Sequence, residues 1–101
     1  MPEKSYIIWL DELTYIVVEF ITVDGRVVCF VVRLMRKFNE IEKCIARYDT
    51  AHGCPHLDLV DDKGRLLEKK WLLEMNLAEA LRFAVEDFKD NFSHYVQSFK
   101  S

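Results

Sequence analysis

The sequence contains little glycine or proline: three glycines and two prolines among 101 residues. Such scarcity argues against a disordered or linker-rich chain. Apolar residues make up 50% of the chain and aromatic residues 13%, so there is enough apolar material for a hydrophobic core. A chain of 101 residues has no room for two independent cores. We therefore expect a single domain that spans residues 1–101.

The chain also lacks a long hydrophobic run. Its longest apolar segment without charge, at 27–32, is far too short to span a bilayer. The apolar run at 6–10 ends at Asp11, so we expect no secretory leader. The cysteines are odd in number: Cys29, Cys44 and Cys54. We expect reduced, small core residues in a cytoplasmic protein that makes no contact with a membrane.

Charge of one sign is not dominant, because the net charge is only −3. This balance does not indicate a general nucleic-acid binder. The charges are nevertheless unevenly placed: residues 1–25 hold one lysine and five acids, whereas residues 26–70 hold ten basic residues and seven acids. The basic middle of the chain could meet RNA or an acidic partner, or it could be the solvated face of several strands.

Two runs rich in β-branched and aromatic residues flank Asp24-Gly25, which is the strongest short-range signal for a β-hairpin. Later extended runs are separated by polar turns, and Pro55 is tolerable at the first position of a strand. The short run YIIWL is a candidate for an additional edge strand. The predicted strands cover 6–10, 13–23, 26–36, 41–49, 55–60 and 65–72.

In the last third of the chain, the spacing of apolar residues changes from that of a strand to that of a helix. Asn76 and Glu79 have the spacing of a helix N-cap and its partner at the third helical position. Apolar residues then recur every three or four positions, from Leu77 to Phe99, while charged residues occupy the other side. This pattern predicts one amphipathic helix over 77–99.

These elements predict an α+β fold: an antiparallel β-meander of four to five strands, with one long C-terminal amphipathic helix packed on one face. The predicted strand at 26–36 is apolar on both faces, and one helix can cover only one of them. The other face would keep Val27, Val31 and Met35. Because a monomer rarely exposes such a patch, we expect a homodimer or a partner protein there.

The stretch RYDTAHGCPH, at 47–56, is the one candidate functional segment. Histidines can exchange protons near neutral pH, so His52 and His56 could serve as base and acid beside Asp49. Arg47 could hold a phosphate, and Tyr48 could stack on a base. These residue types are the parts of a ribonuclease site that needs no metal. We therefore assign His52, His56 and Asp49 as candidate catalytic residues, with Arg47 and Tyr48 as candidate substrate-binding residues.

Two other interpretations of this stretch stay open. His52 and His56, with Asp49, Cys54 or Asp58, could hold a metal ion. Zinc sites, however, usually offer two close pairs of ligands, and a second pair is missing. We therefore expect no metal and no cofactor. Alternatively, the polar residues could simply bond to backbone groups in an irregular turn.

The order of these residues resembles a known family. This order, with Arg47, Tyr48, Asp49, His52 and His56 followed by a strand, a turn, a strand and a helix, resembles TumE-type toxins of toxin–antitoxin pairs. It equally resembles related uncharacterised bacterial and archaeal families. The resemblance covers the layout of roughly residues 14–99 but only those five positions in motif. It implies a small intracellular toxin that is neutralised by a helix-turn-helix antitoxin. The alternative is a homodimeric interaction module without enzymatic activity.

Overall fold

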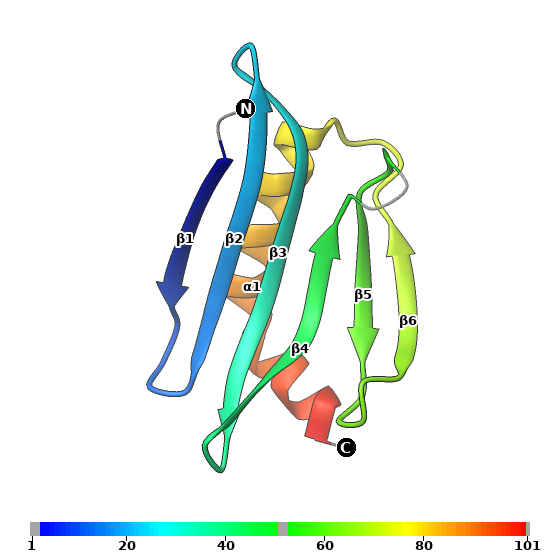
Figure 1. Ribbon diagram of the computed structural model, residues 1–101. Helices are drawn as coiled ribbons and strands as arrows, with labels where there is room; N and C mark the ends of the chain where they lie inside the picture. Colours follow the sequence, from blue (N-terminus) through cyan, green and yellow to red (C-terminus); the bar gives the residue numbers. More distant parts are fainter. Residues whose placement is uncertain (1–2, 51–52, 101) are drawn as a thin grey trace.

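The sheet follows the order of the chain. The structure is a computed structural model that describes residues 3–50 and 53–100. Its six strands form one antiparallel sheet in the order β1 to β6, and a single helix follows (Figure 1). The predicted α+β fold is confirmed, with six strands in place of four to five. The elements are β1 (Glu3–Trp9), β2 (Thr14–Val23), β3 (Arg26–Phe38), β4 (Ile41–Asp49), β5 (His56–Val60), β6 (Leu66–Trp71) and α1 (Leu77–Lys100).

The hairpin between β2 and β3 forms at the predicted turn. Asp24 has φ of 51° and Gly25 has φ of 77°. Two consecutive residues with positive φ are what a type I′ turn requires, and this turn matches the right-handed twist of its flanking strands. The Asp-Gly signal is therefore confirmed as the reversal that begins the central hairpin.

The turn between β3 and β4 has the same backbone shape with a less suitable residue. Asn39 has φ of 49° and Glu40 has φ of 70°. Asparagine tolerates the left-handed region, but glutamate pays a steric cost for it. We expect Glu40→Gly to raise the free energy of unfolding by about 0.5–1 kcal/mol, measured by urea denaturation. The same change at the exposed helical Glu86 should lower stability instead, because glycine is a poor helix former.

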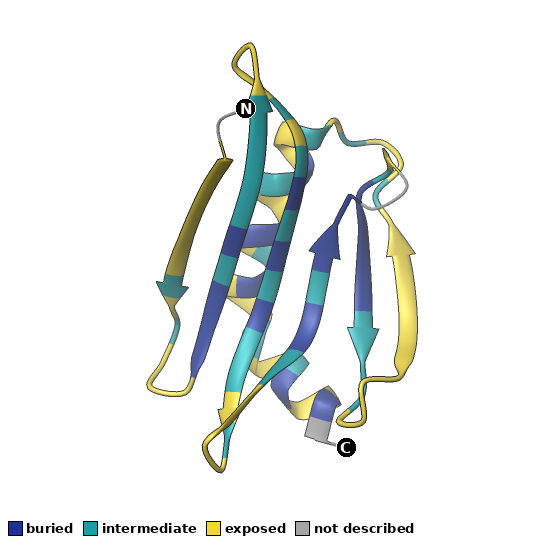
Figure 2. Ribbon diagram, in the orientation of Figure 1, coloured by how far each residue is buried: buried dark blue, intermediate teal, exposed yellow. Residues whose placement is uncertain are grey.

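Helix α1 begins with the predicted cap. The backbone N–H of Glu79 donates to Asn76 Oδ1 at 2.9 Å, and the Asn76 N–H donates to Glu79 Oε1 at 3.2 Å. The helix packs mainly on β3, and also on β4 and β2. Its inner stripe and the strand residues opposite form the core, in which Phe88, Ile16 and Leu34 are fully buried. Figure 2 shows burial concentrated in the middle strands and the inner side of the helix.

A bulge in β3 corrects one detail of the expected second face. Ile21 pairs with Cys29, but Thr22 pairs with Val27, so Val28 is the extra residue. The inserted residue reverses the alternation of side chains. Val27 consequently packs against the core, and Val28 is exposed. The prediction that Val27 lies on the second face was wrong, whereas Val31 and Met35 do lie there.

We call the side of the sheet opposite α1 the open face. Among the described residues, no helix or strand covers it, and Figure 1 views the sheet from this side, with α1 behind β2 and β3. Paired residues of antiparallel neighbours project to the same face. The register therefore shows which residues of neighbouring strands lie side by side on the open face.

The described part of the chain contains no helix that is long and apolar enough to cross a membrane.

Candidate functional site

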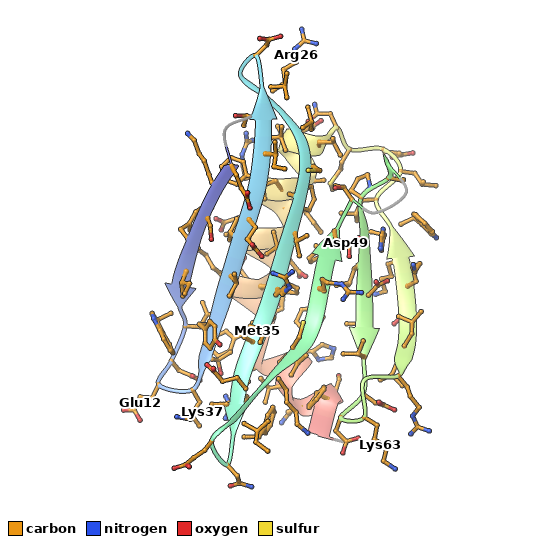
Figure 3. All side chains as sticks on the ribbon, viewed as in Figure 1. Glu12, Arg26, Met35, Lys37, Asp49 and Lys63 are labelled. Atoms are coloured by element: carbon orange, nitrogen blue, oxygen red, sulfur yellow. The ribbon has the colours of Figure 1, made fainter. Side chains whose placement is uncertain are left out.

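The register of β4, β5 and β6 gathers charged residues on the open face. Asp49 pairs with His56, Arg47 pairs with Asp58, and Asp58 pairs with Lys69. Direct partners across antiparallel strands have their Cβ atoms only about 4.5–5.5 Å apart. We call Arg47, Asp49, His56, Asp58 and Lys69 the charged cluster. Figure 3 shows the side chains from the open face and labels Asp49 on β4.

The five side chains of the charged cluster form one connected network. Arg47 bridges the two acids: its Nε lies 2.9 Å from Asp49 Oδ2, and a terminal nitrogen lies 3.0 Å from Asp58 Oδ2. His56 Nε2 lies 3.0 Å from Asp49 Oδ1 and 3.5 Å from Asp58 Oδ2. Lys69 Nζ lies 3.6 Å from Asp58 Oδ1. The two carboxylates are thus surrounded by three groups that can carry positive charge.

The centre of this network is buried although no helix lies over it. The exposed fraction is 1% for His56, 4% for Asp58 and 8% for Asp49. The ring of Trp71 lies 5.0 Å from the His56 ring, and Lys69 Nζ lies 5.4 Å from the Trp71 ring centre. Side chains of the same face therefore exclude water from the carboxylates. Buried charges are tolerated only when they are paired in this way.

The surroundings of Asp58 favour its charged form. Burial alone would raise the pKa of Asp58, but the hydrogen bond from Arg47 and the charges of His56 and Lys69 outweigh burial and lower it. The same hydrogen bond to Asp58 raises the pKa of Arg47, even though burial opposes this. Both groups therefore stay charged at neutral pH, which is what the geometry of a close ion pair requires.

This lowered pKa predicts how stability depends on pH. A carboxylate whose folded pKa is depressed adds stability above its unfolded pKa, and that stability is lost as the pH falls through the folded value. We expect the wild-type free energy of unfolding to fall more steeply than that of Asp58→Asn between about pH 5 and the acid limit. Urea denaturation of both proteins along this range measures it. Parallel pH curves would show that Asp58 adds no acid-sensitive stability.

The structure brings together three of the predicted site residues and separates a fourth. Arg47, Asp49 and His56 lie in the charged cluster. Tyr48 points to the opposite face, where it is buried and its ring lies 5.0 Å from that of Phe88. Its predicted stacking surface for a base is therefore inside the core. His52, the remaining predicted catalytic residue, lies outside the described residues.

Tyr48 takes part in a different polar contact, between the sheet and the helix. Its hydroxyl donates to Asp87 Oδ2 at 2.7 Å, and Tyr95 donates to the same oxygen at 2.5 Å. Burial and the hydrogen bond to Asp87 both raise the pKa of Tyr48. The neutral phenol therefore acts as a hydrogen-bond donor that ties β4 to α1.

Sequence reasoning missed Asp58, Lys69 and Trp71 as members or neighbours of the site. Asp58 was considered only as an additional metal ligand, and Trp71 as filler of a core or an interface. Trp71 is in fact 47% exposed and contacts His56. Parity along the predicted strand already placed Asp58 on the face of His56, and it relates Lys69 to Trp71 in the same way. The missing information was the register that pairs β5 with β6.

A hollow of about 420 Å³ adjoins the charged cluster on the open face. Asp49 belongs to both, and Arg33 and Glu19 line the hollow on β3 and β2. Arg33 and Arg47 are direct cross-strand partners, which would repel each other if they were unpaired. Glu19 forms an ion pair with Arg33, and Asp49 forms one with Arg47, so each guanidinium has its own carboxylate.

Comparison with known proteins gives a family but no activity. Residues 1–101 match the family model described as Domain of unknown function (DUF7718). The chain belongs to this family. Neither a curated protein nor a solved structure matches it. Membership of the DUF7718 family does not assign a reaction to the charged cluster, so any function must rest on the site itself.

Proposed function

We propose that this protein is a homodimeric interaction module whose open face binds a second copy of the chain. One observation carries the proposal: the half of the open face formed by β1–β3 keeps apolar side chains that α1 cannot reach. Ile7 is 55% exposed and Trp9 is 63% exposed. The register places them in rows with Val17 and Met35. Apolar surface gathered in this way marks a protein interface more often than a free surface.

The distribution of charge on the open face supports a second copy as the occupant. Glu19 lies on β2, within the apolar half, whereas Arg47 and Lys69 lie on β4 and β6 in the other half. An isologous dimer places the same patch of both copies around a two-fold axis. Glu19 is paired with Arg33, so an axis near β2 would bury the apolar half of each copy against that of the other without leaving an unpaired charge.

Two isoleucines of similar exposure give a matched test. Ile7, at 55% exposure, is on the open face, whereas Ile41, at 61%, pairs with Phe38, which packs on the core side. We expect Ile7→Lys to dissociate the dimer and Ile41→Lys to leave it intact, as measured by light scattering after size exclusion. If both variants dissociate, or if both stay dimeric, the open face is not the dimer interface.

A second candidate function is an RNA-directed toxin, and the charged cluster is the observation that favours it. Buried networks of titratable groups gather at functional sites. Arg47, which is half exposed, and Lys69 and Trp71 at the rim of the network are the residue types that bind phosphate and stack on bases. The resemblance to TumE-type toxins adds a helix-turn-helix antitoxin as the expected partner.

The toxin candidate has a direct test in growing cells. The side chain of His56 is only 2% exposed, so an acid–base role requires the cluster to open when substrate binds. If the cluster performs the chemistry, induction should arrest growth, and His56→Gln should relieve that arrest although the protein still accumulates. His94→Gln, an exposed histidine on the helix, is the control and should stay toxic. A wild-type chain that leaves growth unchanged would rule the candidate out.

We propose the cytoplasm as the site of action for either candidate. Cys29, Cys44 and Cys54 are all free, as expected for a reducing compartment. Cys29 and Cys44 are only half-buried, in contrast to the core position expected from their strand patterns. Mass spectrometry of thiols alkylated in intact cells tests the assignment, since three reduced thiols support it and a disulfide contradicts it.

A further inference from the structure

Three residues of the charged cluster have the composition of a metal site. Asp49 ends β4, and His56 and Asp58 share one face of β5. All three are buried, and each offers a ligand atom within 4.8 Å of the other two. The sequence alone did not show that Asp49 and Asp58 lie beside His56. Their proximity depends on the pairing of β4 with β5, in which Asp49 is the direct partner of His56.

The tautomer of His56 indicates that a positive charge belongs between these groups. His56 Nδ1 lies 3.1 Å from the carbonyl oxygen of Cys54, which can only accept, so Nδ1 carries a hydrogen. In a neutral imidazole, Nε2 then presents a lone pair. That lone pair faces carboxylate oxygens of Asp49 and Asp58, at 3.0 and 3.5 Å. Asp58 Oδ2 also accepts a hydrogen bond from Arg47, but the contact of Nε2 with the two carboxylates still requires either a second proton on the imidazole or a metal ion.

The distances suit a metal ion as well as a proton. An ion bonded at about 2.0–2.2 Å to nitrogen and oxygen in tetrahedral geometry holds its ligand atoms about 3.4 Å apart. The two separations from His56 Nε2, 3.0 and 3.5 Å, lie on either side of this value. Among the described residues, Asp58 Oδ1 is buried without a hydrogen-bond partner, and Lys69 Nζ lies 3.6 Å from it.

We propose that Asp49, His56 and Asp58 bind one first-row divalent metal ion, with Zn²⁺ as the representative case. An imidazole with two carboxylates suits Zn²⁺ or Mn²⁺ and leaves a position for water. Arg47 and Lys69 already neutralise part of the carboxylate charge and oppose a second cation. Binding is therefore weaker than at a structural zinc site. Metal binding at these residues requires neither dimer formation nor RNA.

The opposing cation provides the sharpest test. Lys69 is not a ligand in this arrangement, so Lys69→Met removes only the charge that competes with the ion. Titration of Zn²⁺ into the chelator-treated, full-length protein, followed by calorimetry, should give one ion per chain. We expect Lys69→Met to tighten binding about tenfold and Asp58→Asn to weaken it at least tenfold. Asp62→Asn, an exposed residue of the turn after β5, should leave the affinity unchanged.

Each outcome decides the proposal. Tighter binding by Lys69→Met together with weaker binding by Asp58→Asn supports it. Absence of Zn²⁺ binding overturns it, and so does binding that neither variant alters, because the ion would then lie at the cysteines or at another histidine. If Asp58→Asn fails to fold by circular dichroism, Lys69→Met decides alone: an unchanged affinity would overturn the assignment.

Discussion

Replacing Arg47 with methionine is expected to lower the free energy of unfolding by about 3 kcal/mol, because removal of one partner leaves the buried charges of the others uncompensated. Arg47 and His56 both contact Asp49 and Asp58, and Arg47 has the shorter contact with Asp58. Methionine keeps most of the length and apolar stem of arginine but none of its donors. The measurement is urea denaturation at neutral pH, where Asp58 is charged.

Arg65 is the matched control for that experiment. It also pairs with an aspartate, Asp61, at 2.8 Å, but its side chain is 72% exposed. Exposed ion pairs add little to stability, since water and salt screen them. Arg65→Met should therefore barely shift the unfolding midpoint. If Arg47→Met and Arg65→Met are equally mild, the charged cluster does not hold β4 and β5 together.

Truncation of Phe88 to alanine should destabilise the protein by about 3–5 kcal/mol, as for other fully buried phenylalanines. Phe88 is completely buried under the sheet, and its ring contacts Tyr48 at 5.0 Å and Tyr95 at 5.3 Å. Both tyrosines also bond to Asp87, so the cavity would lie beside the polar contact that ties β4 to α1.

Phe83 provides the comparison on the same helix. It is 42% exposed and touches Tyr48 only edge-on, at 6.1 Å. Phe83→Ala should cost about 1 kcal/mol or less, since surface substitutions rarely change stability more. Thermal unfolding of both variants by circular dichroism distinguishes the two positions. A loss at Phe83 as large as that at Phe88 would mean that the helix is seated differently on the sheet.

Local signals in the sequence were sufficient for most of the fold. The Asp24-Gly25 turn, the Asn76–Glu79 cap and the apolar stripe of α1 each depend on residues close together in the chain, and each is confirmed. The bulge at Val28 was not predictable in this way, because it depends on how β2 and β3 register with each other. One extra residue was enough to move Val27 to the core side.

The candidate site was harder to predict because its geometry is not local. The segment 47–56 was recognised from its residue types, yet neighbours along a strand point to opposite faces. Tyr48 therefore lies on the opposite face from the charged cluster, whereas Asp58 of β5 and Lys69 of β6 belong to it. The burial of His56 was also not predictable from the sequence, because Trp71, which shields it, lies fifteen positions further along the chain.

The central claim is that α1 shelters one side of the sheet and a second copy of the chain shelters the other. Sedimentation equilibrium of the wild-type protein at micromolar concentration tests it most directly. The account predicts a particle of twice the 12.0 kDa chain mass, reduced to a single chain by Ile7→Lys. A single-chain mass for the wild type across the whole concentration range would contradict it.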